Sequence, residues 1–301
     1  MKTENLKQGI IYMLIASFCF AVVGACTRVL RDDISSVEIV FFRNVIGVLF
    51  IGYSVFRRPL VQSGGKPALL VFRGVIGTIA LYTFFYSITQ IGLAEAITYQ
   101  QTYPIFIAVF SVFVAGEGLR RNEWLAVILG FAGICFIFVP QMSGGLMSTR
   151  NHIIGIGNAI LTAFAYMSIR GLSGYYDGRS IVLSFMISGI VLPIISMVIG
   201  QFYDFPSLDF LVAAYIQPHG TAWLWIIFLG ISAMIGQIYL TKAFSYGKAG
   251  AISAVGFSNI VFSVIFGVFL GDPSPTTIAF LGIIFVITSG IIISYQSKKE
   301  A

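Results

Sequence analysis

Charged residues are scarce in this chain: only 10% of its 301 residues are Asp, Glu, Lys or Arg. A typical soluble domain carries about 25%. Histidine is rarer still, with only His152 and His219 present, and the three cysteines include no CxxC pair. A metal site needs several such side chains close together. We therefore expect neither a metal nor a cofactor.

Catalytic motifs are missing as well. The sequence contains no GxxxxGK[ST] phosphate loop, no HExxH and no GxSxG. Neither ATP-driven pumping nor hydrolysis has a visible set of residues. We predict that the protein is not an enzyme, and we assign no catalytic residue. Two alternatives remain open: a membrane-embedded enzyme that modifies lipids, and a receptor or scaffold that binds a ligand without flux.

Apolar sequence is what the chain has in abundance. Hydrophobic residues make up 57% of it, and the mean hydropathy is +0.93. Windows of about 20 apolar residues predict spans at residues 8–30, 36–56, 69–89, 94–115, 122–140, 152–172, 180–201, 220–240, 249–270 and 276–295. These runs are apolar on every side, whereas strands of membrane barrels alternate polar and apolar residues. We therefore predict an all-α integral membrane protein with ten transmembrane helices.

The basic residues predict how this bundle is oriented. If the N-terminus is cytoplasmic, 14 Lys and Arg residues fall on the cytoplasmic side, and only Arg28, Arg31 and Arg150 fall on the other. Such a bias predicts a multi-pass protein of the cell inner (plasma) membrane with both termini in the cytoplasm. The basic residues lie in short loops and not in one stripe, so we expect no nucleic-acid partner.

The chain also contains a weak internal duplication. Residues 92–117 have a degenerate copy 158 residues later, in which Gln101 matches Asn259. Five spans per half is an odd number, so the two halves must have opposite orientations in the membrane. We predict two inverted five-helix repeats, at residues 1–140 and 152–301. A Gly- and Ser-rich linker at residues 141–151 joins them. Inverted repeats are common in secondary transporters, whose substrate site lies between them near the middle of the bilayer.

Polar side chains inside the spans are the candidate substrate-binding residues. A buried amide or hydroxyl without a partner costs a few kcal/mol, so these groups should face protein or a water-filled path. The candidates are Arg43, Tyr82, Tyr99, Gln100, Gln101, Tyr103, Asn158, Thr162, Tyr166, Gln237 and Asn259. Tyr99, Tyr103 and a neighbouring glutamine would form a wall able to stack on a ring and hydrogen-bond its edge. For each residue, hydrogen bonding between helices is the alternative.

Arg43 gives the sharpest of these signals. An arginine away from a helix end costs at least about 2.5–3.5 kcal/mol in a membrane. One interpretation is a cation that binds an anionic or carboxylate-bearing substrate. The other is a structural pair with Glu95 or with a helix C-terminus. The sequence leaves both open.

Three further residues are candidates for gating. Pro104 interrupts the helical hydrogen-bond ladder in the middle of a span, which would permit bending. Arg73 and Glu117 lie near the cytoplasmic ends of their spans. We predict that this pair latches the cytoplasmic side of the cavity when it closes.

Several short motifs, taken in order, resemble a known family. They are EIVFFR (38–43), FRGVIGTIALYTFFYSITQIGLAEA (72–96), TYPIF (102–106) and VAGE (114–117), with degenerate copies in GQIYLTKAFSYGKAGAISA and FLGD. In order and spacing they resemble the EamA-domain branch of the ten-helix drug/metabolite transporter superfamily, and the resemblance covers nearly the whole chain.

The resemblance implies a secondary active transporter, an exporter or exchanger of small metabolites such as amino acids or nucleoside-like or carboxylate compounds. Access to a central cavity would alternate between the two sides of the membrane. A facilitative uniporter is the alternative. The implied partners are a small-molecule substrate and the lipid bilayer, and the protein would be a monomer or a homodimer.

Overall fold

The computed structural model describes residues 6–30, 33–61, 64–91, 93–114, 118–138, 149–203, 205, 208, 210–246, 249–270 and 277–299. This part of the chain forms twelve helices and no strand. The helices are α1 (Leu6–Leu30), α2 (Ser36–Arg57), α3 (Pro67–Ile91), α4 (Leu93–Gln100), α5 (Tyr103–Val114), α6 (Arg121–Phe138), α7 (Thr149–Leu172), α8 (Gly178–Phe202), α9 (Ala222–Tyr246), α10 (Ala249–Val255), α11 (Ser258–Phe269) and α12 (Thr277–Lys299).

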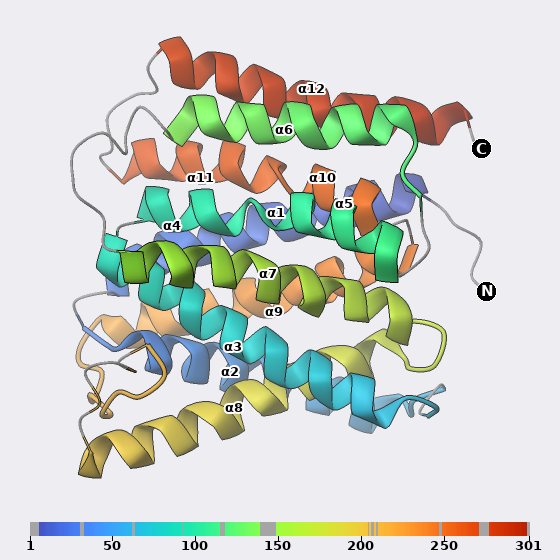
Figure 1. Cartoon of the computed structure of the whole chain (residues 1–301). Coiled ribbons are helices and arrows are strands. Elements are labelled where there is room, and N and C mark those ends of the chain that lie inside the picture. Colours follow the sequence, from blue (N-terminus) through green and yellow to red (C-terminus); the bar gives the residue numbers. More distant parts are fainter. Residues whose placement is uncertain are drawn as a thin grey trace.

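The twelve helices occupy ten positions, because two of the predicted spans are broken. α4 and α5 follow one another along one line, as do α10 and α11 (Figure 1). The first break falls just before Pro104, whose ring lacks an N–H and clashes with the carbonyl four residues earlier. The second break contains Gly256, and glycine weakens a helix interior. Each broken span is therefore a pair of half-helices that end inside the bundle.

The outer surface of the bundle is suited to lipid. Seven segments of the described chain are long and apolar enough to cross a membrane. They are the α10–α11 pair and the six single helices α1, α2, α3, α7, α8 and α9. Large apolar side chains point outward from the bundle, for example Leu49, Phe56, Phe113 and Phe269. Exposed apolar surface of this extent is expected where lipid covers the protein. The prediction of an all-α integral membrane protein is confirmed.

Contacts between helices repeat in the two halves of the chain. α1 packs on α9 as α7 packs on α3, and α2 packs on α9 as α8 packs on α3. Two helices pack against their own counterparts, α2 against α8 and α6 against α12. Figure 1 shows α6 and α12 side by side and running in opposite directions. This is the arrangement of two inverted repeats about a pseudo-twofold axis that passes through the α2–α8 and α6–α12 contacts.

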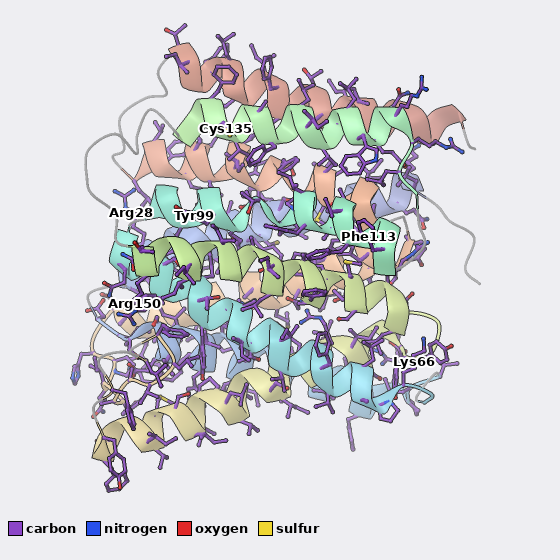
Figure 2. The ribbon with its side chains drawn as sticks, in the orientation of Figure 1. Arg28, Lys66, Tyr99, Phe113, Cys135 and Arg150 are labelled. Carbon is purple, nitrogen blue, oxygen red and sulfur yellow. The ribbon has the colours of Figure 1, made fainter. Side chains whose placement is uncertain are left out.

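Both described ends of the chain lie at one end of the bundle, which we call the terminal face. α1 begins there and α12 ends there (Figure 1). Lys66 lies at the same face, whereas Arg28 and Arg150 lie at the opposite face (Figure 2). This distribution is the one expected from the basic residues. The side of the membrane that each face meets remains a prediction, as does the division of the chain at residues 140 and 152.

Glycine allows the α6–α12 contact to be close. A Cβ atom placed on Gly133 of α6 would lie 2.6 Å from the carbonyl oxygen of Gly282 in α12, and a backbone atom cannot move aside as a side chain does. We expect Gly133→Ala to destabilise the protein by about 1–3 kcal/mol, seen as a lower thermal unfolding temperature in detergent. Gly157→Ala is the matched control, because no atom lies within 4 Å of its Cβ position in α7. Equal stability of the two variants would contradict this prediction.

Candidate functional site

A cavity lies inside the bundle, with about 900 Å³ of space that no atom fills, part of it open to solvent. Its lining comes from both halves: from α1 to α5 in the first, and from α7, α8, α9 and α11 in the second. The α6–α12 pair contributes none of the described lining residues. Much of the wall is apolar and aromatic, including Phe20, Phe84 and Phe85, and polar groups are gathered in two clusters.

The first cluster consists of two arginines that converge on one aromatic ring. Arg43 of α2 is 4% exposed and Arg73 of α3 is 1% exposed. Their guanidinium carbons lie 5.8 Å and 4.4 Å from the centroid of the Phe185 ring of α8. Both are close enough to the Tyr166 hydroxyl of α7, and to one another, for electrostatic interaction. We call Arg43, Arg73, Phe185 and Tyr166 the arginine cluster.

The positive charge of this cluster is not neutralised by any described side chain. Nε and Nη1 of Arg73 are buried without a hydrogen-bond partner. Arg43 has no ion pair with a described residue, and no described lining residue is Asp or Glu. A cation–π contact recovers about 0.5–2 kcal/mol, which is less than the membrane cost of one arginine. Among the described residues, the cluster therefore leaves an uncompensated positive charge in the cavity wall.

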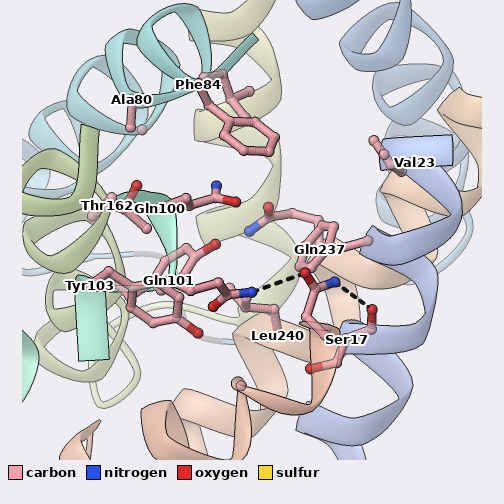
Figure 3. Close-up of a pocket in the computed structure, with 18 of the residues that line it drawn as sticks. Ser17, Val23, Ala80, Phe84, Gln100, Gln101, Tyr103, Thr162, Gln237 and Leu240 are labelled. Atoms are coloured by element: carbon pink, nitrogen blue, oxygen red, sulfur yellow. Dashed lines mark hydrogen bonds between the residues drawn. The ribbon is translucent and has the colours of Figure 1, made fainter. Parts of the chain in front are cut away.

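The second cluster is made of carboxamides at the two helix breaks. Gln101 Nε2 donates to Asn259 Oδ1 at 3.0 Å, and Asn259 Nδ2 donates to the Ser17 carbonyl at 2.8 Å (Figure 3). Gln101 and Asn259 are the pair matched in the internal repeat, so equivalent positions of the two halves meet beside the pseudo-twofold axis. In Figure 3 the carboxamides of Gln100 and Gln237 also point into the cavity. We call Gln100, Gln101, Gln237 and Asn259 the carboxamide cluster.

Most of the predicted binding residues are brought together in this cavity. Those that line it are Arg43, Gln100, Gln101, Tyr103, Thr162, Tyr166, Gln237 and Asn259. Tyr103 packs its ring edge-on against Tyr166, with 5.1 Å between centroids. Arg73, which we assigned to a gate, lines the cavity as well. That these residues bind a substrate remains a prediction.

Three other candidates lie away from the cavity lining. The Tyr82 hydroxyl is 3.0 Å from that of Ser196, and Asn158 Nδ2 donates to the Ala80 carbonyl at 2.6 Å. The ring of Tyr99 lies against Gly155, whose missing side chain leaves room for it. Tyr82 and Asn158 thus make hydrogen bonds between helices and are not among the lining residues of the cavity, and a role for them in substrate binding remains a prediction.

Of the three residues predicted to act in gating, Arg73 and Pro104 lie among the described residues. Pro104 is the second residue of α5, directly after the break. Glu117 lies outside the described residues, and so does the side chain of Glu95. The predicted Arg73–Glu117 latch and the predicted Arg43–Glu95 pair therefore remain predictions.

Comparison with known proteins gives a consistent result. Residues 7–139 match the model of the EamA-like transporter family. An uncharacterized transporter of Helicobacter pylori strain J99 is 31% identical over 97% of this chain and 96% of its own. The chain belongs to the EamA-like transporter family. The resemblance drawn from the sequence motifs is thereby confirmed, and the protein is a multi-pass membrane transporter and not an enzyme.

Other relatives of this EamA-like transporter have named substrates. The pseudopaline exporter CntI of Pseudomonas aeruginosa is 29% identical over 99% of this chain and 100% of its own. An S-adenosylmethionine uptake transporter of Rickettsia prowazekii is 21% identical, over 99% of this chain and 96% of its own. A crystal structure of a protein with 15% identity has a TM-score of 0.77 and matches 99% of both chains, which supports the fold. These relatives are transporters of metabolites, and their substrates differ.

The EamA-like cavity also contains residues that the sequence did not single out. The Phe185 ring makes cation–π contacts with both arginines. Part of the wall is formed by Phe20, Phe84 and Phe85. A phenylalanine in an apolar span gives no signal of its own, because lipid, helix packing and a cavity wall all accept it.

Proposed function

We propose that the protein is a secondary transporter that exports or exchanges small anionic metabolites, such as carboxylates, across the cell inner membrane. The observation that carries this proposal is the pair of buried arginines without an acidic partner among the described lining residues. An anionic substrate would supply the missing charge, through hydrogen bonds of the strong, charge-assisted kind. Phe185 holds the two guanidinium groups in place between transport events.

Alternating access between the halves, residues 1–140 and 152–301, is the proposed mechanism. In inverted repeats each half can adopt the conformation of the other, which turns a cavity open on one side into a cavity open on the opposite side. The cavity lining is shared by both halves, so a relative movement of the halves changes the access to it. The terminal face is the cytoplasmic one in this proposal, because most Lys and Arg residues lie on that side.

The arginine cluster also predicts what the transporter rejects. A cationic substrate would meet two buried positive charges and no acid among the described lining residues. Like charges in a site of low dielectric cost several kcal/mol. We therefore propose that S-adenosylmethionine, the substrate in the name of one relative, is not carried by this chain.

A thermal-shift screen followed by counterflow tests the proposal. Glutarate, malate and uridine monophosphate are expected to raise the unfolding temperature of the purified protein, whereas lysine and S-adenosylmethionine are not, because only a bound ligand stabilises. The stabilising anions should then show counterflow in proteoliposomes without chemical conversion. Stabilisation by the cations alone, or anion binding without flux, would contradict the proposed function.

A further inference from the structure

The carboxamide cluster has hydrogen-bonding capacity that the protein leaves unused. Gln101 and Gln237 are each 3% exposed, yet Oε1 of Gln101 and Nε2 of Gln237 have no hydrogen-bond partner. Leaving a buried polar atom unpaired costs about 1–3 kcal/mol. Both residues line the cavity, one from the first half and one from the second.

The orientation of the Gln101 carboxamide follows from its neighbours. The Ser17 carbonyl can only accept, so the atom of Asn259 that faces it must be the NH₂ group. Asn259 Oδ1 is then the acceptor for Gln101, and the NH₂ group of Gln101 must face it. The free atom of Gln101 is thereby fixed as an oxygen. The cavity thus offers one buried acceptor of fixed identity.

Gln237 supplies a complementary group. It comes from α9, and Figure 3 shows its carboxamide directed into the cavity near those of Gln100 and Gln101. In the orientation that the structure shows, its unpartnered atom is Nε2, a donor. A ligand that meets both glutamines therefore needs one donor for Gln101 and one acceptor for Gln237.

We propose that the substrate carries, besides its anionic group, a neutral carboxamide whose N–H donates to Gln101 Oε1 and whose oxygen accepts from Gln237 Nε2. This inference rests on the proposed function, in which the arginine cluster holds the anionic group. An ammonium group would also donate to Gln101, but the two arginines of the same cavity repel it. A carboxamide presents a donor and an acceptor on separate atoms in one plane, which suits two separate glutamine side chains.

Matched pairs of small acids test the inference. Succinamate, glutaramate and adipamate each carry one carboxylate and one carboxamide at increasing separation. In the methyl ketone acids of equal chain length, a methyl group replaces NH₂, so only the donor is lost. At the length that binds best, we expect the amide acid to bind about tenfold more tightly than its ketone, the value of one hydrogen bond. Calorimetric titration of the purified protein measures both.

Two variants test whether Gln101 causes the preference for the amide acid over its ketone. Gln101→Leu is expected to abolish the difference between amide and ketone, because neither ligand then meets the buried acceptor. Thr241→Val is the control: Thr241 is also buried with an unpartnered hydroxyl, but it does not line the cavity, so the preference should persist.

The outcomes separate the inference from the proposed function. Equal binding of amide and ketone acids that both depend on Arg73 would overturn the inference and leave an anion transporter. A preference that survives Gln101→Leu would overturn it too. Binding of both acids that is unchanged in Arg73→Gln would instead contradict the proposed function.

Discussion

Arg73→Gln is expected to abolish transport while leaving the protein as thermally stable as before, or more stable. Arg73 is 1% exposed, and two of its nitrogen atoms lack a partner, so the folded protein without substrate carries the cost of a buried charge. Glutamine removes that charge. Loss of one partner from a desolvated charge pair costs about 2–5 kcal/mol, so affinity for a carboxylate should fall about 30-fold or more.

The measurement has two parts, unfolding temperature in detergent and anion counterflow in proteoliposomes. Arg43→Gln should have the same effects on stability and transport. The loss of anion-binding free energy in the double variant should not exceed the sum of the two single losses, because both arginines bind one anion. Arg57→Gln is the control, since this arginine is exposed and lies over Tyr53 outside the cavity. Normal transport in Arg73→Gln, or a loss of folded protein equal to the loss of transport, would refute the role of this residue.

The polar part of the cavity wall was predictable because polar groups are rare in spans and few environments accept them. Arg43, Gln101 and Asn259 were singled out by polarity alone, and all three line the cavity. The pairing of Gln101 with Asn259 in the repeat even predicted two equivalent positions, which the structure joins by a hydrogen bond. Burial without compensation costs too much to be accidental.

Polarity does not by itself separate a cavity from a contact between helices. Asn158 Nδ2 donates to the Ala80 carbonyl and the Tyr82 hydroxyl pairs with that of Ser196, so both side chains hydrogen-bond to a neighbouring helix inside the packed bundle, although Oδ1 of Asn158 is left without a partner. The sequence shows that a buried polar side chain needs a hydrogen-bond partner. It does not show which group in the fold is that partner. Phe185 illustrates the opposite case, a residue central to the site with no polarity to mark it.

From its position in the sequence, Arg73 was predicted to lie near the cytoplasmic end of its span. That prediction did not take the length of its side chain into account. Its Cα lies in the second turn of α3, but the long side chain extends inward to the Phe185 ring. Arginine places its charge well away from its own backbone. A depth estimate from helical rise alone cannot show this.

Linking the two halves at the terminal face is expected to arrest transport. There the α2–α3 connection of the first half meets the α7–α8 connection of the second. The Gly64 amide donates to the Tyr175 carbonyl at 3.3 Å, and Lys66 Nζ lies 4.4 Å from the Tyr175 ring centroid. Arg179 Nη1 also donates to the Arg58 carbonyl at 2.7 Å. If access alternates between the halves, these contacts must open in each cycle.

Gly64→Cys with Tyr175→Cys provides the link, in a chain whose natural cysteines Cys19, Cys26 and Cys135 are replaced by alanine. A short bifunctional methanethiosulfonate should reduce counterflow to the level of empty liposomes, and dithiothreitol should restore it. Each single cysteine variant treated in the same way is the control and should keep its transport, because a reagent attached at one end leaves the loops free. Undiminished flux in the linked protein would show that these two connections stay together throughout the cycle, and the opening movement would then have to occur across another interface between the halves.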